Sequence, residues 1–113
     1  MPSKPRLGRY VNSTSRGQVG IAPDGQVPQD FEAQCAQAMG NAEAVLEAAG
    51  MGMSDVFRLT YYLVRREDLP ALNRLRLARW HGIRPAVTTL LVAGLVRPEL
   101  LVEIDVWAQR ERS

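Results

Sequence analysis

The sequence predicts a single α+β domain in which two helices cover one face of a mixed β-sheet. The chain has 113 residues, a length typical of one domain. Two segments have the apolar spacing of amphipathic helices, and they alternate with β-like segments in the order strand, helix, strand, helix, strand, strand. Apolar and polar residues alternate in the last segment, 100–109, which is typical of a strand with one covered face.

The N-terminal part predicts a tail followed by β structure. Residues 1–7 contain two prolines and two basic residues and are predicted as a tail, so that the domain spans 8–113. Residues 9–21 are β-like and end in the turn sequence Ala-Pro-Asp-Gly at 22–25.

The first helix is predicted from residue 31 to residue 49. Asp30 is a suitable N-cap residue just before it. Apolar residues then recur at steps of three and four, as on one side of an amphipathic helix: Phe31, Cys35, Ala38, Ala42, Val45 and Ala49. Gly50 follows this stripe, where a left-handed C-terminal cap favours glycine.

A strand and a second helix follow. Residues 56–64 are rich in aromatic and β-branched side chains and predict a strand. Its odd positions are all bulky and apolar: Phe57, Leu59, Tyr61 and Leu63. Asp68 is expected to cap the second helix, with Pro70 in its first turn and its end near Trp80.

Two further strands complete the predicted sheet, at 85–92 and 100–109, joined through Arg97-Pro98-Glu99. In the last strand, one face carries Val102, Ile104, Val106 and Ala108, and the other carries Leu101, Glu103, Asp105 and Trp107. Two helices can cover only one face of such a sheet. Association of copies, closed into a ring, is the simplest way to cover the other face, and a monomer with a partly exposed sheet is the alternative.

Charge and composition favour a protein of the cytoplasm that does not bind nucleic acid or membranes. The net charge is +2, and the arginines are dispersed along the chain, whereas a nucleic-acid groove usually has a denser basic stripe beside aromatic residues. Arg74, Arg76 and Arg79 are predicted to form a solvated helix face paired with acids. No secretory leader and no apolar run of about 20 residues is evident.

Several kinds of site are disfavoured by residue type. One histidine and one cysteine cannot form the usual metal site of several nitrogen or sulfur ligands. His81 is predicted as a surface residue at the end of a helix, and Cys35 as a core thiol. The sequence has no glycine-rich phosphate loop and no dinucleotide fingerprint. We therefore expect neither a metal nor a cofactor.

Glu103 and Asp105 are the remaining candidates for chemistry. Two acids spaced by two residues on a strand point to the same face and lie roughly 6–7 Å apart. If that face is solvated, both are ordinary surface acids. If it is buried between subunits, at least one carboxylate must be paired or functional, and a half-buried glutamate can deprotonate a water molecule.

Several segments resemble the RidA/YjgF family, in the right order and over nearly the whole chain after Gly17. The resemblance rests on Gly17-Gln18-Val19-Gly20 with Pro23-Asp24-Gly25, on Val45 to Gly50, on Asp55-Val56, on Asn73, on Arg84-Pro85-Ala86 and on Leu101 to Asp105. It implies a homotrimer of α+β subunits whose sheets line a central barrel, with a ligand cleft at each interface. It also implies hydrolysis of small reactive imines and enamines, as by a 2-iminobutanoate/2-iminopropanoate deaminase.

The resemblance assigns roles to individual positions. Glu103 matches the glutamate that handles the attacking water. Thr89 and Asn73 match cleft positions, and Gly17 matches the glycine whose backbone lines the cleft. Gly8-Arg9-Tyr10 corresponds to a Gly-x-Tyr motif, which places Tyr10 at the cleft.

Two departures from the family pattern concern the substrate anion. Deaminating members carry an arginine directly after Pro-Ala, which binds the substrate carboxylate in a bidentate fork, and here that position is Val87. Arg16 stands where the family has a serine, and two interpretations remain: it supplies a displaced anion site, or it points to solvent. Three functions are therefore open: imine hydrolysis with Glu103, capture of a small ligand by a non-catalytic trimer, and, less favoured, RNA cleavage or inhibition of translation.

Overall fold

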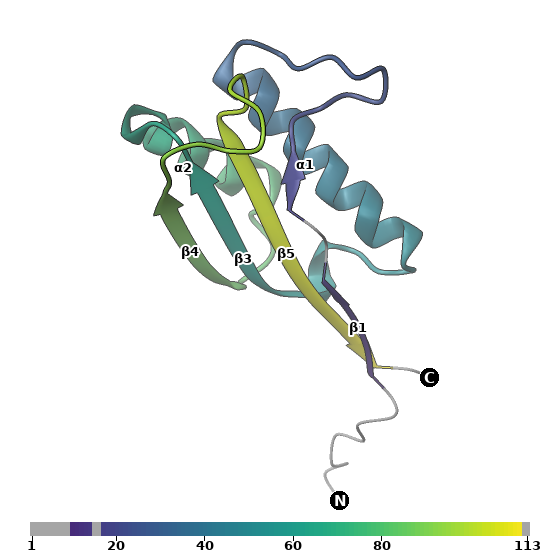
Figure 1. Cartoon of the computed structure of the whole chain (residues 1–113). Coiled ribbons are helices and arrows are strands. Elements are labelled where there is room, and N and C mark those ends of the chain that lie inside the picture. The colour runs from purple at the N-terminus through teal and green to yellow at the C-terminus, as the bar shows by residue number, and fades with distance from the viewer. Residues whose placement is uncertain (1–9, 15–16, 112–113) are drawn as a thin grey trace, which may run out of the picture.

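The computed structural model describes residues 10–14 and 17–111 and confirms the α+β class (Figure 1). The strands are β1 (Tyr10–Thr14), β2 (Gln18–Val19), β3 (Val56–Leu63), β4 (Ala86–Leu91) and β5 (Val102–Glu111). The helices are α1 (Phe31–Ala48) and α2 (Leu69–Arg79), with short 3₁₀ turns at Met53–Asp55 and Arg66–Asp68. The β-like segment predicted at 9–21 is thus two separate strands.

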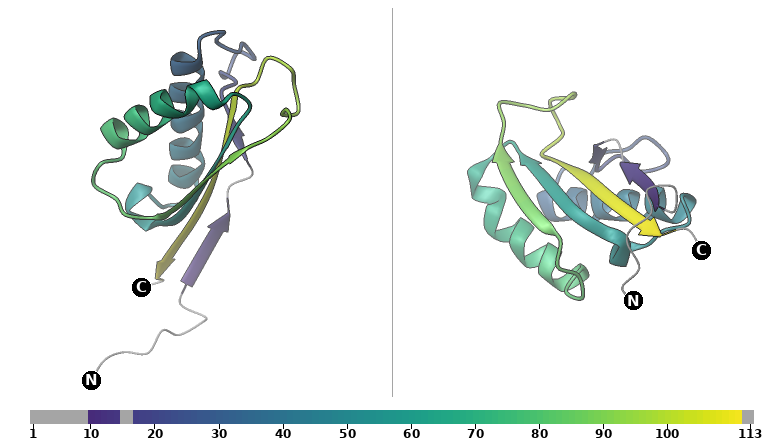
Figure 2. Two further views of the ribbon diagram at one scale, coloured as in Figure 1. Left: turned by 90° about the vertical axis from the view of Figure 1, so that its left-hand side faces the viewer. Right: turned by 90° about the horizontal axis from the view of Figure 1, so that it is seen from below.

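The long strand β5 organises the sheet. The strand order is β1-β5-β3-β4, and β2 pairs with β5 on the same side as β1. Strand β5 is antiparallel to β1, β2 and β3, whereas β3 and β4 are parallel, so the sheet is mixed as predicted. Both helices lie against one face, and the other face carries no helix (Figure 2).

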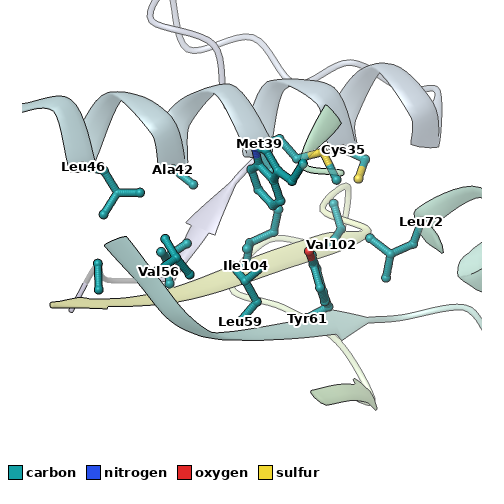
Figure 3. Close-up of a cluster of buried hydrophobic side chains, with 14 of the residues drawn as sticks. Cys35, Met39, Ala42, Leu46, Val56, Leu59, Tyr61, Leu72, Val102 and Ile104 are labelled. Carbon is teal, nitrogen blue, oxygen red and sulfur yellow. The ribbon is translucent and has the colours of Figure 1, made fainter. Parts of the chain in front are cut away.

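The core fills the space between the helices and the sheet (Figure 3). The predicted inward face of β5 is confirmed, because Val102, Ile104, Val106 and Ala108 are all buried. The predicted stripe of α1 is partly wrong. Its buried residues are Phe31, Gln34, Cys35, Ala38, Met39, Ala42 and Leu46, while Val45 is half-buried and Ala49 is exposed. After Ala42 the predicted stripe continues through Val45 and Ala49, whereas the buried face of the helix continues through Leu46. A polar residue, Gln34, also belongs to the buried face.

The alternation of buried and exposed side chains predicted for β3 fails at the start of the strand. Leu59, Tyr61 and Leu63 are buried as expected, but Phe57 is 50% exposed and Val56 is buried instead. The pairing of β3 with β5 shifts register between Val56 and Arg58, and a bulge of this kind reverses the faces of the residues before it.

Residues at the ends of α1 behave as predicted. The Asp30 carboxylate accepts a hydrogen bond from the Ala33 amide at 3.0 Å. At the other end, Gly50 has φ +75°. Its amide donates to Glu47, and the Met51 amide donates to Leu46, which is the Schellman arrangement of a helix C-terminus.

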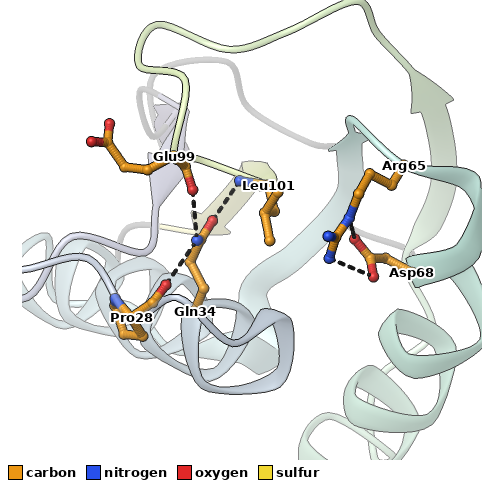
Figure 4. Close-up of polar contacts among 6 residues, drawn as sticks. All are labelled: Pro28, Gln34, Arg65, Asp68, Glu99 and Leu101. Atoms are coloured by element: carbon orange, nitrogen blue, oxygen red, sulfur yellow. Dashed lines mark hydrogen bonds and ion pairs between the residues drawn. The ribbon is translucent and has the colours of Figure 1, made fainter.

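Asp68 stands at the N-cap position of α2, but the expectation that its side chain caps the helix is wrong. The carboxylate instead accepts two hydrogen bonds from Arg65, at 2.8 and 3.1 Å (Figure 4). Asp68 has helical backbone angles (φ −84°, ψ −7°), because a 3₁₀ turn leads directly into α2. In that geometry the side chain makes no capping hydrogen bond.

Gln34 fastens two loops to α1 and so fixes where β5 begins (Figure 4). Its buried amide nitrogen donates to the carbonyl oxygens of Pro28 and Glu99, at 3.0 and 3.1 Å. Its amide oxygen accepts from the Leu101 amide at 2.6 Å. Each of these backbone groups would otherwise lack a partner beside a buried face. The start of β5, and with it the position of Glu103, is thereby set by a helix residue.

Candidate functional site

Glu103 lies on the sheet face that carries no helix. In β5 it follows the buried Val102, and its neighbours across the sheet are Val19 in β2 and Tyr62 in β3. Since side chains alternate along a strand, Asp105 shares this face with Glu103, as predicted. The Tyr62 hydroxyl donates a 2.9 Å hydrogen bond to the Asp105 carboxylate. Two acids and a tyrosine thus form one polar group on this open face.

The backbone of Gly17 runs directly against the Glu103 side chain. A methyl group at position 17 would overlap the Glu103 carboxylate, so this close approach requires glycine. Strand β2 is held in place from the helix side: the Asn41 amide donates to the carbonyl oxygens of Val19 and Ile21, at 2.8 and 3.0 Å. Gly20 has no room for a side chain either, because α1 passes beside it at Gln34. The structure therefore brings together two of the predicted site residues, Gly17 and Glu103.

Burial, a hydrogen bond and nearby charge raise the pKa values of two groups on the open face, the Glu103 carboxyl and the Tyr62 hydroxyl. Partial burial raises the pKa of the Glu103 carboxyl above its usual value, and the negative charge of Asp105 raises it further. The hydrogen bond to Asp105 raises the pKa of the Tyr62 hydroxyl, which keeps it protonated as a donor. Asp105 therefore has a hydrogen-bond donor beside it, and Glu103 is the carboxyl whose proton is held more tightly than usual.

Asn73, Val87 and Thr89 lie on the helix-covered side of the sheet, away from Glu103 of the same chain. Val87 and Thr89 are the register partners of Leu59 and Tyr61, which are buried under the helices. Asn73 belongs to α2, and its side-chain oxygen accepts from Arg76. A single chain therefore does not gather all the predicted site residues around one point.

Thr89 lines a shallow pocket of about 280 Å³ at the β4 edge, together with Leu63, Leu69, Leu90, Leu91 and Arg66. Val87 is not among these residues and is 39% exposed. Of the remaining predicted residues, Tyr10 belongs to β1, where its backbone pairs with that of Glu111. Arg16 lies outside the described residues.

The residues given structural roles by the sequence lie where expected. Cys35 is fully buried, and burial raises the pKa of its thiol to about 12, so it is a poor nucleophile. His81 is exposed just after α2, with its ring nitrogen 3.3 Å from the Ala78 carbonyl oxygen. Arg74 and Arg79 pair with Glu32 and Glu43, as predicted for a solvated helix face. Arg76 is different, because it binds the Asn73 amide and no acid in the described part of the chain.

The described residues offer neither a metal site nor a membrane-spanning helix. No cluster of three or more histidine, cysteine, aspartate or glutamate side chains there could hold a metal ion. No helix in the same residues has the length and apolar character needed to cross a bilayer.

Several large exposed apolar side chains lie on the strands. They include Leu90, at 45% exposure, and Trp107, at 41%. Leu90 is the register partner of Tyr62, and Trp107 shares the face of Glu103 and Asp105, so both belong to the open face. This face thus combines apolar surface with the polar group around Glu103.

Sequence reasoning missed Tyr62, Gln34 and Asn41. Tyr62 stands at an even, outward position of β3, and its partnership with Asp105 depends on the pairing of β3 with β5. Gln34 and Asn41 are polar residues on a helix that was interpreted by its apolar residues. The spacing of seven between them, close to two helical turns, is a signal that they share one side of α1.

Comparisons with known proteins support the resemblance. The family model described as Endoribonuclease L-PSP matches residues 8–110. The chain is 31% identical to the 2-iminobutanoate/2-iminopropanoate deaminase of Escherichia coli K12 over 115 residues, covering 92% of this chain and 89% of that protein. It is 32% identical to the RutC family protein PH0854 of Pyrococcus horikoshii over 97 residues, covering 84% of this chain and 76% of that one. A crystal structure of YyfA, a Rid family protein of unknown function from Yersinia pestis, superposes with a TM-score of 0.82 at 31% identity, covering 86% of this chain and 79% of that one. The chain therefore belongs to the RidA/YjgF family.

Proposed function

We propose that the chain hydrolyses a small imine or enamine to a carbonyl compound and ammonia, in a cleft between copies of a cytoplasmic homotrimer. The single observation that carries this proposal is the half-buried Glu103 carboxyl on the open sheet face, against the backbone of Gly17. The similarity to a deaminase over 92% of the chain supports the reaction class. Cys35 is a free, buried thiol, and a free thiol suits a reducing compartment, which supports the cytoplasm as the location.

The proposed reaction needs one proton acceptor and one water molecule. The Glu103 carboxylate takes a proton from water as the oxygen attacks the carbon of the protonated imine, and the carbon–nitrogen double bond becomes a single bond, which gives a carbinolamine. Glu103 then passes this proton to the nitrogen. The carbon–nitrogen bond breaks as the hydroxyl oxygen forms the carbonyl double bond and gives its proton to the Glu103 carboxylate, so that ammonia leaves and the carbonyl compound remains. A carboxyl with a raised pKa suits both steps, since it holds and releases a proton nearer to neutral pH.

The cleft must be built from two copies. Glu103 and Gly17 lie on the open face, whereas Asn73, Val87 and Thr89 lie on the helix side near the β4 edge. A neighbour that brings its β4 edge to the open face would place both groups around one ligand. The exposed Leu90 and Trp107 support such an association, because apolar surface of this kind is rarely left in water.

Capture of a small ligand without turnover is the second candidate. Val87 favours it, because a valine cannot bind the carboxylate that an arginine holds at this position in deaminating members. RNA cleavage has less support. The chain has one histidine, His81, which is exposed just after the end of α2. It therefore lies in the helix layer, whereas Glu103 is on the opposite face of the sheet.

Ammonia release from freshly generated 2-iminobutanoate tests the proposal. We expect Glu103→Gln to lower the rate at least a hundredfold, since general base catalysis contributes about 10²–10⁴-fold. Glu99→Gln is the matched control. This exposed carboxylate lies four residues away and pairs with Arg97, so its loss should leave the rate within twofold. If the natural protein releases ammonia and Glu103→Gln releases it equally fast, the mechanism is wrong. If no rate exceeds background while a ligand raises the melting temperature, the binding candidate is favoured.

A further inference from the structure

A second pocket, of about 290 Å³, lies on the helix-covered side of the sheet, between α2, the segment after it and β3. Its apolar wall consists of Leu59, Leu77, Trp80 and Ile83. Leu59 is the register partner of Val87, and Pro85 also lines the pocket. The pocket therefore borders the position where the family's anion-binding arginine is missing.

The charged residues of this pocket are all basic. They are the arginines Arg76 and Arg84, and no carboxylate lines the pocket; His81 lies in its wall as well. Arg74 and Arg79 of the same helix pair with Glu32 and Glu43. Within residues 17–110, by contrast, neither Arg76 nor Arg84 forms an ion pair with an acid. The two guanidinium groups at the pocket thus keep their positive charge uncompensated.

A buried hydroxyl in the same pocket wall has no partner. Tyr61 is fully buried, and its hydroxyl oxygen has no hydrogen-bond partner among the described residues. Burial raises the pKa of this hydroxyl, with the charge of Arg76 acting the other way, so it stays a protonated donor. Buried polar groups are normally hydrogen-bonded, so this hydroxyl is an unmade hydrogen bond in a residue that lines the pocket.

We propose that this pocket binds the carboxylate of a small organic anion with a short aliphatic body, held by Arg76 and Arg84. The arginines supply the charge, and the leucine, isoleucine and tryptophan side chains contact the carbon chain. Its volume, at the lower end for ligand sites, suits a molecule of a few carbons. We further identify this anion as the substrate, with Arg76 and Arg84 in place of an arginine at position 87; this identification rests on the proposed function.

Calorimetric titration with 2-oxobutanoate, the keto acid that hydrolysis of 2-iminobutanoate yields, tests the site. We expect Arg84→Gln and Arg76→Gln each to raise the dissociation constant at least tenfold, because each removes a charge-assisted hydrogen bond. Arg74→Gln is the matched control on the same helix, outside the pocket, and should change it less than twofold. Arg84 is exposed, so Arg84→Gln should keep the natural melting temperature. Arg76 is half-buried, so its variant is used only if its melting temperature is also unchanged.

The uncharged 2-oxobutanamide separates anion recognition from apolar binding. We expect it to bind at least tenfold more weakly than the acid. Equal binding of the amide and the acid would overturn the proposal, as would a dissociation constant for Arg84→Gln equal to that of the natural protein.

The same proteins separate this inference from the proposed function. Binding that depends on Arg84, without any ammonia release, would leave the anion site standing and overturn the deaminase. Ammonia release that depends on Glu103 but is unchanged in Arg76→Gln and Arg84→Gln would overturn the identification of the anion as the substrate and leave the deaminase standing. If both hold, we expect the arginine variants to raise the KM for 2-iminobutanoate and Glu103→Gln to lower kcat.

Discussion

Glu103 illustrates how a residue proposed to act in catalysis can cost stability. Its pKa in the folded protein is raised, mainly by burial and further by Asp105, so the folded state binds the proton more tightly than the unfolded state. The stabilising effect of this proton is fully present below the ordinary glutamate pKa and is lost as the pH rises through the raised value. Above that value the charged carboxylate destabilises the fold.

We therefore expect Glu103→Gln to melt at a higher temperature than the natural protein at pH 8, and the difference to vanish at pH 4. Thermal unfolding at the two pH values checks this. Glu99→Gln should behave in the opposite way, because Arg97 lowers the pKa of Glu99. A Glu103→Gln variant that is less stable at pH 8 would show that the carboxylate is well paired rather than half-buried.

For catalysis, the raised pKa of Glu103 predicts a rate of ammonia release that falls as the pH drops through the raised value.

Gly17 sets the position of the Glu103 carboxylate. The β-carbon of an alanine there would overlap this group, and a flexible glutamate side chain can move aside at little cost to folding. We expect Gly17→Ala to lower ammonia release at least tenfold with a nearly unchanged melting temperature. Gly94→Ala is the control, because a β-carbon at position 94 meets open space. Full activity of Gly17→Ala would mean that the carboxylate does not act from this position.

At the residue scale the sequence predicted the directions of side chains better than their partners. The period of two in 100–109 was enough to place Glu103 and Asp105 on one face. The partnership of Tyr62 with Asp105, and the contact of Gly17 with Glu103, depend on which strands pair and in which register. The local sequence pattern of a strand does not specify which strand it pairs with.

At the scale of elements, Gln34 connects α1 to the start of β5. Replacing it by leucine would leave the Pro28 and Glu99 carbonyls and the Leu101 amide without their present partners in a partly buried place. Each such group costs about 1–3 kcal/mol, so we expect Gln34→Leu to lower the free energy of unfolding by about 3 kcal/mol or more.

Chemical denaturation measures this loss, with Glu47→Leu as the control. Glu47 is an exposed residue of the same helix, where such a change should stay within about 0.5 kcal/mol. A loss as small as that of the control would show that water molecules replace the amide. The activity of Gln34→Leu should also fall, because its hydrogen bonds fix the start of the strand that carries Glu103.

The elements themselves were predicted well, and each error has an identifiable physical cause. The Asp30 and Gly50 signals placed the ends of α1, because caps act within a few residues of the chain. The face of β3 was wrong at Phe57, since a bulge depends on the partner strand. Asp68 does not cap α2, because Arg65, three residues earlier, binds both of its oxygens.

At the scale of the whole molecule, the sequence predicted the two layers and the uncovered sheet face, but not which residues would meet in the proposed assembly of copies. The positions of Val87 and Thr89 in the structure make the expected link between assembly and activity more specific. Because Val87 and Thr89 face away from Glu103 in one chain, assembly and activity must be linked if the proposed site exists. A monomer would carry two incomplete halves.

Assembly therefore tests the proposal in a way that no substitution of a catalytic residue can. We expect sedimentation to give the mass of three 12.5 kDa chains. Leu90→Glu places a charge on the open face beside Tyr62 and should shift the protein toward monomers, because burying an unpaired charge is costly. Val96→Glu is the control: it changes an apolar residue of the segment between β4 and β5 that is 84% exposed, and the mass should stay that of the natural protein. Ammonia release should fall in parallel with the trimer fraction across dilutions of Leu90→Glu. Activity that persists in a fully monomeric sample would mean that one chain contains the whole site, and that the two-copy cleft is wrong.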